Sequence, residues 1–234
     1  MSEKVTIPRV LYKYIPSKFV DSFLQEGDIL FRNLPYFKKV EDGDVRGDIL
    51  EGTHRDTGKN GDGGVMKLKS GERIKCDYFD NSIETDEKTF IFCLSKIYNE
   101  KLYEEFECDA CVKIKNTKEF IDLCIRKLLI TKGKQSKLYF NHVKYYGSHE
   151  DVSEYIKEPS MIPLLKREKY SYQEEFRLYY AIDDVFKIKK SITIKNSNPF
   201  NLPPDKTPKP EPTELKKIIP LGNIRPITEV IYKP

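Results

Sequence analysis

Three polar side chains that could do chemistry stand at alternate positions of one apolar segment: Gln173, Glu175 and Arg177. Bulky apolar residues such as Phe176 and Leu178 fill the alternate positions, with Glu174 as the exception. A period of two is typical of a half-buried β-strand, and we predict one across residues 170–182. The amide, the carboxylate and the guanidinium would then form a row on one face, about 6.5–7 Å apart. A solvent-facing strand with a surface Glu–Arg pair explains this pattern, and so does a functional site.

A glutamate on a strand suits the chemistry of a sugar cation. Its carboxylate can stabilise an oxocarbenium-like carbon and can orient or deprotonate the nucleophile that attacks it. A tyrosine ring can stack on a nicotinamide, a serine can order the glutamate or a ribose, and a basic side chain can hold a pyrophosphate. Residues of these types lie at the ends of other predicted strands: Tyr12, Lys13, Tyr14, Arg32 and Ser95.

Several enzyme classes lack their motifs in this chain. There is no GxSxG, no HExxH and no phosphate-binding glycine loop. The three histidines, His54, His142 and His149, show no metal-ligand spacing. The five cysteines are expected to be reduced thiols, and the lone CxxC at Cys108–Cys111 has no second pair for a zinc site. We therefore predict no metal site.

Composition indicates a single large, charged domain. The chain has 234 residues, of which 38% are hydrophobic and 33% charged, and 13 Phe and 15 Tyr supply bulky core residues. The net charge of +4 permits a polyanionic partner without demanding one. We find no signal peptide and no apolar run of the ~18–20 residues that a membrane span needs. The expectation is a cytoplasmic protein with no membrane partner.

The pattern of the chain predicts an α+β domain over residues 1–234, rich in strands and with short helices. The most apolar strand, 89–95, should be central. Residues 52–74 contain six glycines and are expected to form a flexible loop or loose hairpin. Residues 77–88 are acidic and are expected to be exposed, and the proline-rich 199–212 is expected to be a stiff extended loop. Other expected strands are 5–15, 29–33, 111–115, 138–146, 188–194, 215–221 and 227–232, and expected helices are 17–27, 102–106, 118–129 and 149–157.

The order of these motifs resembles the ADP-ribosyltransferase superfamily, in its arginine–serine–glutamate class. Residues 173–175 match the Gln/Glu-x-Glu element of that class. The central strand ends in Ser95, as part of a Ser-Thr-Ser element in which Cys93 stands where the first serine would be. The first arginine of the class corresponds to either Arg9 or Arg32.

The chain more closely resembles an uncharacterised bacterial family found in toxin and phage-defence loci. Residues 11–14 match its Leu-Tyr-His-Tyr motif with lysine in place of histidine, and residues 36–37 followed by 41–42 and 51–52 look like a diverged second motif. Residues 92–95 match its Phe-x-x-Ser motif, and 172–177 its Tyr-Glu-x-Glu-Trp-Arg motif with phenylalanine for tryptophan.

These resemblances imply a fold, a substrate and roles for residues. The fold would be a split β-sheet core, and the activity would transfer ADP-ribose from NAD to a macromolecule, RNA or DNA rather than protein. The protein would be an intracellular toxin or phage-defence effector, with a neutralising antitoxin as a partner. Glu175 would be catalytic and Gln173 would orient the acceptor, although Gln173 could equally be an ordinary polar strand residue. Arg177 would be either a structural partner of Glu175 or a ligand contact. The NAD-binding residues would be Tyr12, Lys13, Tyr14, Arg32, Ser95 and Arg177.

Two other functions remain open at this point. A non-catalytic module of the same fold, such as a defence sensor that binds nucleic acid or protein, fits the lysine at position 13 and the incomplete serine motif. A nuclease is a weaker alternative, because the chain lacks a clustered carboxylate–lysine signature, although Asp42, Asp44 and Asp48 could gather a metal ion.

Overall fold

The structure is a computed structural model that describes residues 5–39, 53–57, 65–67, 71, 73–75, 78–85, 88–132, 137–147, 152–195 and 215–234. Within them, helices and a mostly antiparallel sheet give the expected α+β class. The main sheet contains eight strands: β1 (Leu11–Ile15), β2 (Asp28–Asn33), β7 (Thr89–Ser95), β8 (Ala110–Ile114), β9 (Tyr139–His142), β12 (Glu175–Ala181), β14 (Lys216–Pro220) and β15 (Thr228–Tyr232).

The main sheet forks at its central strand. β12 pairs with β7 along its whole length on one edge, from Glu175 opposite Ser95 to Ala181 opposite Thr89. On the other edge, β2 pairs near the start of β7 and β1 pairs only at its end. One arm continues from β2 to β14, and the other from β1 through β8 to β15. The prediction that residues 89–95 form the central strand is confirmed, since β7 holds both arms and β12 together.

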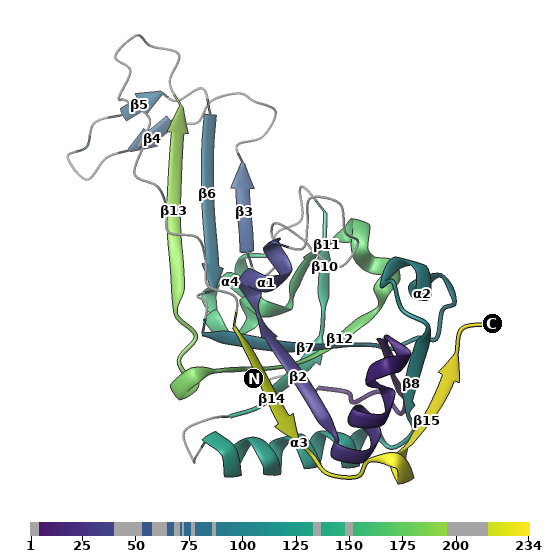
Figure 1. The fold of residues 1–234 in the computed structure, drawn as a ribbon. Helices are drawn as coiled ribbons and strands as arrows, with labels where there is room; N and C mark the ends of the chain where they lie inside the picture. Colours follow the sequence, from purple (N-terminus) through teal and green to yellow (C-terminus); the bar gives the residue numbers. More distant parts are fainter. Residues whose placement is uncertain are drawn as a thin grey trace.

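The main core lies on one face of this sheet. Alternate residues of β7 and β12, such as Phe92 and Phe176, pack there against the long helix α3 (Thr117–Lys132), whose buried residues include Phe120 and Leu128. Figure 1 shows α3 crossing beneath the sheet. Asn116 caps this helix, because its side chain accepts a hydrogen bond of 3.2 Å from the amide of Glu119. The predicted helix 118–129 is confirmed.

The opposite face of the sheet is covered by short elements, and this face carries the candidate site. Two apolar clusters lie on it, one around Tyr14 and Cys111 and the other around Ile91 and Tyr179. The elements near them are α1 (Leu34–Lys39), α2 (Lys101–Glu105), α4 (Ser153–Lys157), η4 (Pro159–Leu164) and η5 (Glu168–Gln173). A parallel pair, β10 (Lys144–Tyr146) and β11 (Leu165–Arg167), lies among them.

A second, smaller sheet rises away from the main one (Figure 1). It consists of β3 (Thr53–Thr57), β6 (Tyr78–Thr85) and β13 (Ile188–Lys195), and the pair β4 (Val65–Lys67) and β5 (Arg73–Lys75) lies near its far end. The acidic segment 77–88, for which only exposure was expected, is mostly the strand β6. Part of the glycine-rich segment 52–74 forms paired strands, and apart from Gly71 its other residues lie outside the described chain, as does the proline-rich 199–212.

The remaining described elements are single turns: η1 (Ser17–Phe19), the π-helical turn η2 (Ser22–Glu26), η6 (Ile182–Asp184) and η7 (Arg225–Ile227). The helix expected over residues 17–27 is confirmed, because the chain is helical from Ser17 to Glu26 and ends at Gly27, although its first turn is a 3-10 turn and its last a π-helical turn. No helix among the described residues is both long enough and apolar enough to span a bilayer.

Candidate functional site

Three of the predicted site residues fall in one row across three neighbouring strands. Tyr12 of β1 lies opposite Ser95 of β7, and Ser95 lies opposite Glu175 of β12. Residues directly opposite on neighbouring strands present their side chains to the same face of a sheet. The fold therefore brings together an aromatic ring, a hydroxyl and a carboxylate that are far apart in the sequence.

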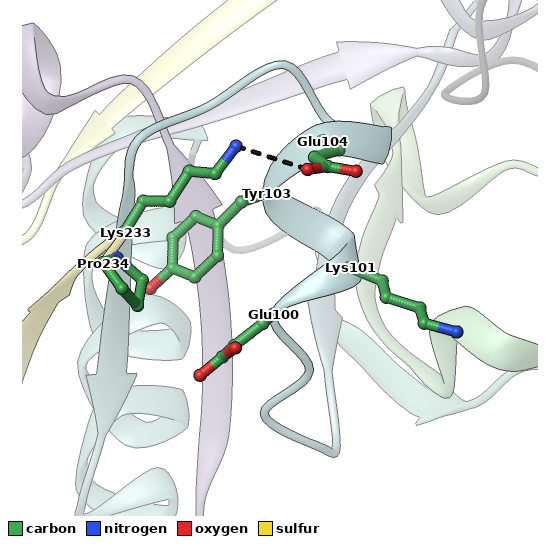
Figure 2. Close-up of a pocket in the computed structure, with 6 residues that line it drawn as sticks. All are labelled: Glu100, Lys101, Tyr103, Glu104, Lys233 and Pro234. Atoms are coloured by element: carbon green, nitrogen blue, oxygen red, sulfur yellow. Dashed lines mark ion pairs between the residues drawn. The ribbon is translucent and has the colours of Figure 1, made fainter.

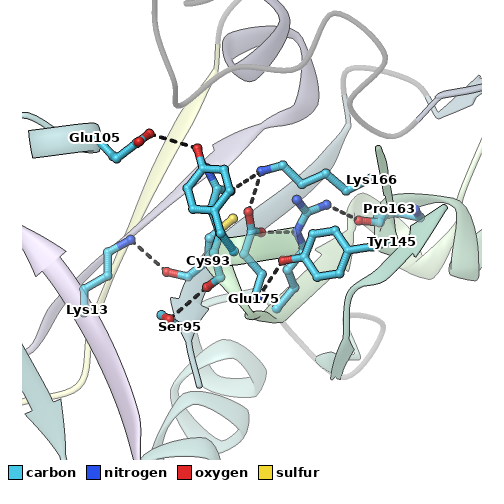
Figure 3. Close-up of polar contacts among 11 residues, drawn as sticks. Lys13, Cys93, Ser95, Glu105, Tyr145, Pro163, Lys166 and Glu175 are labelled. Carbon is cyan, nitrogen blue, oxygen red and sulfur yellow. Dashed lines mark hydrogen bonds and ion pairs between the residues drawn. The ribbon is translucent and has the colours of Figure 1, made fainter. Parts of the chain in front are cut away.

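The carboxylate of Glu175 is held between two cations. Lys166 of β11 donates a short hydrogen bond to Oε1, and the Nε of Arg177 donates to Oε2 over 2.8 Å (Figure 3). Glu175 is 5% exposed, Lys166 3% and Arg177 0%. The Nη1 of Arg177 also donates to the carbonyl of Pro163 over 2.6 Å. The predicted Glu–Arg pair is therefore real, but it is buried and not on the surface.

This environment keeps Glu175 ionised. Burial by itself raises the pKa of a carboxyl group, but the charges and hydrogen bonds of Arg177 and Lys166 outweigh it and lower the pKa of Glu175 to about 2. A carboxylate with so low a pKa is a weak base near neutral pH. It is well suited to stabilise a positive charge that forms beside it.

The backbone of Glu175 is fixed as well. Its amide donates to the hydroxyl of Tyr145 in β10 over 2.8 Å, and its carbonyl accepts from the amide of Val143 over 3.1 Å. Burial and the nearby negative charge of Glu175 raise the pKa of Tyr145, so the phenol stays neutral. The start of β12 is thus held by the β9–β10 segment along one edge, and Figure 3 shows Tyr145 beside the carboxylate.

Gln173 belongs to the site but not to the strand, which corrects the prediction of one strand across 170–182. Glu174 has the left-handed backbone angles φ 46° and ψ 51°, so the chain turns there and β12 begins only at Glu175. Every residue of β12 is buried, so the strand is not half-buried. The amide oxygen of Gln173 accepts from Lys166 over 2.7 Å, and its backbone carbonyl accepts from the hydroxyl of Ser95 over 2.8 Å.

Tyr12 and Tyr14 share the face of Glu175, but they differ in their surroundings. Tyr12 is half-buried, with its ring centroid 5.9 Å from that of Tyr98. Tyr14 is 8% exposed and packs edge-on against Tyr103, and its hydroxyl accepts from the amide of Asn99 over 2.7 Å. Tyr14 is therefore part of the packing on this face, whereas Tyr12 is placed where a ligand could reach it.

Lys13 is not brought to the carboxylate. It alternates with Tyr12 and Tyr14 along β1 and so faces the main core, where its Nζ lies 4.5 Å from the centroid of the Phe92 ring. The same ammonium donates to the backbone carbonyl of Cys93 over 2.9 Å, at the part of β7 that lies between its pairings with β2 and β1. Lys13 thus satisfies a backbone group in the fork of the sheet.

Arg32 lies on the face of Glu175 but farther along the sheet. It is opposite Ile91, four residues before Ser95, which is roughly 13 Å along a strand. Its guanidinium stacks on the ring of Tyr36, 3.9 Å from the centroid. The structure therefore does not place Arg32 beside the carboxylate, and a contact with a ligand of Glu175 would need a long molecule.

Two residues of the site, Lys166 and Tyr145, are not predicted from the sequence. Lys166 follows the apolar run 162–165, and nothing in that run predicts that its ammonium turns inward. The one available signal is that Lys166 continues this apolar run, but the charged residues that follow it, such as Arg167 and Lys169, favour an exposed strand end. Tyr145 carries no such signal, because tyrosine is common in strands.

Among the described residues, the site contains no reactive thiol and no cluster of metal ligands. Cys93, Cys108, Cys111 and Cys124 are free cysteines there, and burial raises the pKa of Cys93 and Cys111 to about 12. No group of three or more His, Cys, Asp or Glu side chains gathers among the described residues. The acidic loop 41–48 lies outside them, so the nuclease alternative rests on sequence alone.

A pocket of about 250 Å³ lies at another place, between α2 and the last residues of the chain (Figure 2). It contains an ion pair of 3.7 Å between Lys233 and Glu104. Its lining contains none of the predicted site residues: Glu100, Lys101, Tyr103, Glu104, Lys233 and Pro234.

The comparisons with known proteins give no independent guide to this site. Neither a protein-family model, nor a curated protein, nor a solved structure matches the chain.

Proposed function

We propose that this protein is an ADP-ribosyltransferase that uses NAD as its substrate and Glu175 as its catalytic carboxylate. The observation that carries the proposal is the register of Tyr12, Ser95 and Glu175 across β1, β7 and β12. An aromatic ring, a hydroxyl and an ionised carboxylate on one face are the groups that nicotinamide riboside chemistry needs. The forked sheet also supports the finer fold assignment to the ADP-ribosyltransferase-like class.

In the proposed reaction the bond between the ribose carbon and the nicotinamide nitrogen breaks. Nicotinamide leaves with the electron pair, and the ribose carbon becomes positively charged. The Glu175 carboxylate stabilises that charge, since its low pKa keeps it anionic. An acceptor atom then forms a bond to the carbon and loses its proton to solvent. Ser95 acts as a positioning residue, because it ties the end of β7 to the carbonyl of Gln173.

For the acceptor we propose a nucleic acid, and for the setting an intracellular toxin or phage-defence effector with a neutralising protein partner. The net charge of +4 supports a polyanionic acceptor, since lysine and arginine favour contact with phosphates. The motif order of the resembling toxin and defence family supports the setting.

One observation favours a second candidate, a non-catalytic binding module. Both carboxylate oxygens of Glu175 are already engaged, and the residue is 5% exposed. A carboxylate that serves only to neutralise Lys166 and Arg177 would have the same geometry.

The deciding experiment compares Glu175→Gln with its neighbour Glu174→Gln. Glu174 is 43% exposed and pairs with Lys96 over 2.6 Å, so it is a matched control outside the carboxylate site. Nicotinamide release from NAD would be measured with RNA, DNA and protein each offered as acceptor. We expect Glu175→Gln to lower the rate about 100-fold or more, and Glu174→Gln to leave it unchanged.

Two outcomes would contradict the proposal. Equal NAD turnover in Glu175→Gln and wild type would remove Glu175 from the chemistry. Absence of NAD turnover in folded wild-type protein, with every acceptor, would favour the binding module. In that case nucleic-acid binding should persist in Glu175→Gln and weaken steeply with salt.

A further inference from the structure

The two cations that hold Glu175 differ in how firmly they are fixed. Arg177 is on the same strand two residues away, is fully buried, and has a second anchor in the carbonyl of Pro163. Its planar guanidinium is set by both contacts. Lys166 comes from β11, outside the main sheet, and carries a point charge on a flexible chain of four methylenes. Its second contact is the side-chain amide oxygen of Gln173, 2.7 Å away, on the turn η5. Of the two cations, Lys166 is the one that can leave without rearranging β12.

The ammonium of Lys166 makes another favourable contact in the position where it pairs with Glu175. Its Nζ lies 4.9 Å from the centroid of the Tyr170 ring, within the range of a cation–π contact. Tyr170 belongs to η5, the turn that leads directly to Gln173. If the ion pair with Glu175 breaks, the ammonium of Lys166 can keep its contact with this ring. The charge would then still have a favourable partner.

The contact between Lys166 and Oε1 of Glu175, which we call the closed arrangement, opposes the proposed chemistry. Taken together, Lys166, Glu175 and Arg177 carry one negative and two positive charges within hydrogen-bond distance. A ribose carbon that becomes positive would need the position beside Oε1. The ammonium of Lys166 already occupies that position and would repel the new positive charge. With Lys166 removed, the contact from Arg177 to Oε2 would remain, and Oε1 would be left without its cation.

We infer that Lys166 is a built-in competitor of the NAD donor: its ammonium occupies the position of the sugar cation at Glu175, and donor binding must displace it. The inference rests on the proposed function and adds regulation of the same site. Removal of Lys166 should therefore strengthen donor binding, whereas removal of a residue that binds the donor would weaken it.

The test measures the NAD dissociation constant by calorimetry for the wild type, Lys166→Met and Lys166→Arg. Methionine fills the space of the buried chain without charge, whereas arginine retains the competing cation. If Lys166 keeps the site closed in about nine-tenths of the molecules, Lys166→Met should bind NAD about tenfold more tightly. Lys166→Arg should stay within about twofold of the wild type. Lys96→Met is the matched control: Lys96 pairs with Glu174 at the same turn but does not touch Glu175, so its removal should change nothing.

A second measurement separates displacement from general loosening of the fold. Hydrogen exchange of residues 159–176 would be followed with and without NAD. In the wild type NAD should speed exchange there by displacing Lys166, and in Lys166→Met NAD should slow it, since the site is already open. Should Lys166→Met not fold, Lys166→Gln removes the same charge and retains hydrogen-bonding groups.

The outcomes distinguish this inference from the function on which it rests. If the wild type binds and cleaves NAD but Lys166→Met binds it equally or more weakly, the competitor role is wrong and the transferase stands. If wild type and all variants are folded and none binds NAD, the proposed function fails and the competitor role fails with it.

Discussion

At the scale of single residues, the site depends on one carboxylate that is both buried and charged. Glu175 tolerates burial because Lys166 and Arg177 each contact one of its oxygens. Removing either partner would leave a buried charge less well compensated, which is costly in proteins. The same contacts couple the protonation of Glu175 to the stability of the fold.

This coupling predicts a specific acid sensitivity. The pKa of Glu175 is lowered in the folded state from 4.5 to about 2, so its ion pairs stabilise the fold above pH 4.5 and are lost as the pH falls toward 2. The full effect is on the order of 3 kcal/mol. We expect urea unfolding between pH 2 and 6 to show a steeper loss of stability in the wild type than in Glu175→Gln.

Glu174→Gln serves as the control in that titration, because Glu174 is a partly exposed neighbour whose ion pair is screened by solvent. It should retain the wild-type slope. Parallel stability curves for wild type and Glu175→Gln would show that the carboxylate does not titrate with folding.

At the scale of elements, the connections around the sheet depend on backbone conformations that few residues adopt. The turn η2 ends at Gly27, whose φ is 62°, and the chain after β14 passes close to it. The carbonyl of Gly27 accepts from the amide of Leu221 over 3.1 Å, and that of Glu26 accepts from the amide of Gly222 over 2.9 Å. These contacts join the start of the chain to the edge strand β14.

We predict that Gly27→Ala destabilises the protein more than Gly222→Ala does. Both glycines have positive φ, so each substitution costs about 1–2 kcal/mol in backbone strain. A Cβ on Gly27 would also lie 2.4 Å from the carbonyl oxygen of Gly222, whereas a Cβ on Gly222 would meet nothing within 4 Å. Denaturant unfolding should give a loss of about 3 kcal/mol or more for Gly27→Ala. Equal losses for the two variants would contradict the close approach.

At the scale of the whole molecule, the forked sheet makes β7 the element on which the others depend. It pairs with β12 along one edge and with both arms along the other, and all but one of its residues are buried. The outer strands β14 and β15 each pair with one neighbour. An opening of either arm would leave β7 and β12 paired.

Native-state hydrogen exchange should therefore be slowest in residues 89–95 and should report global unfolding there. The outer strand β14 should exchange faster, through local opening of its arm. The measurement is exchange followed by mass spectrometry on peptides from both strands. Protection of β14 equal to that of β7 would mean that the sheet opens only as a unit.

Local sequence patterns indicated many of the strands and helices of this fold, but not which strands pair with one another. The apolar, β-branched run at 89–95 identified the central strand, and the helical spacing of Phe120 and Leu128 identified α3. The segment 77–88 was missed as a strand, because its charges conceal the pattern that strand β6 would otherwise show. The strand at 170–182 was placed too early, since no rule of periodicity shows that Glu174 adopts a left-handed conformation.

For the candidate site, the sequence by itself determined which residue types were present and that Glu175 and Arg177 alternate on a strand, because period two is a property of the backbone. Only the tertiary structure decided that this strand is buried on both faces, that Lys166 and Tyr145 reach Glu175, and that Lys13 faces the other way into the fork. These are contacts between segments distant along the chain, and they depend on register and on which strands pair, which no local pattern encodes.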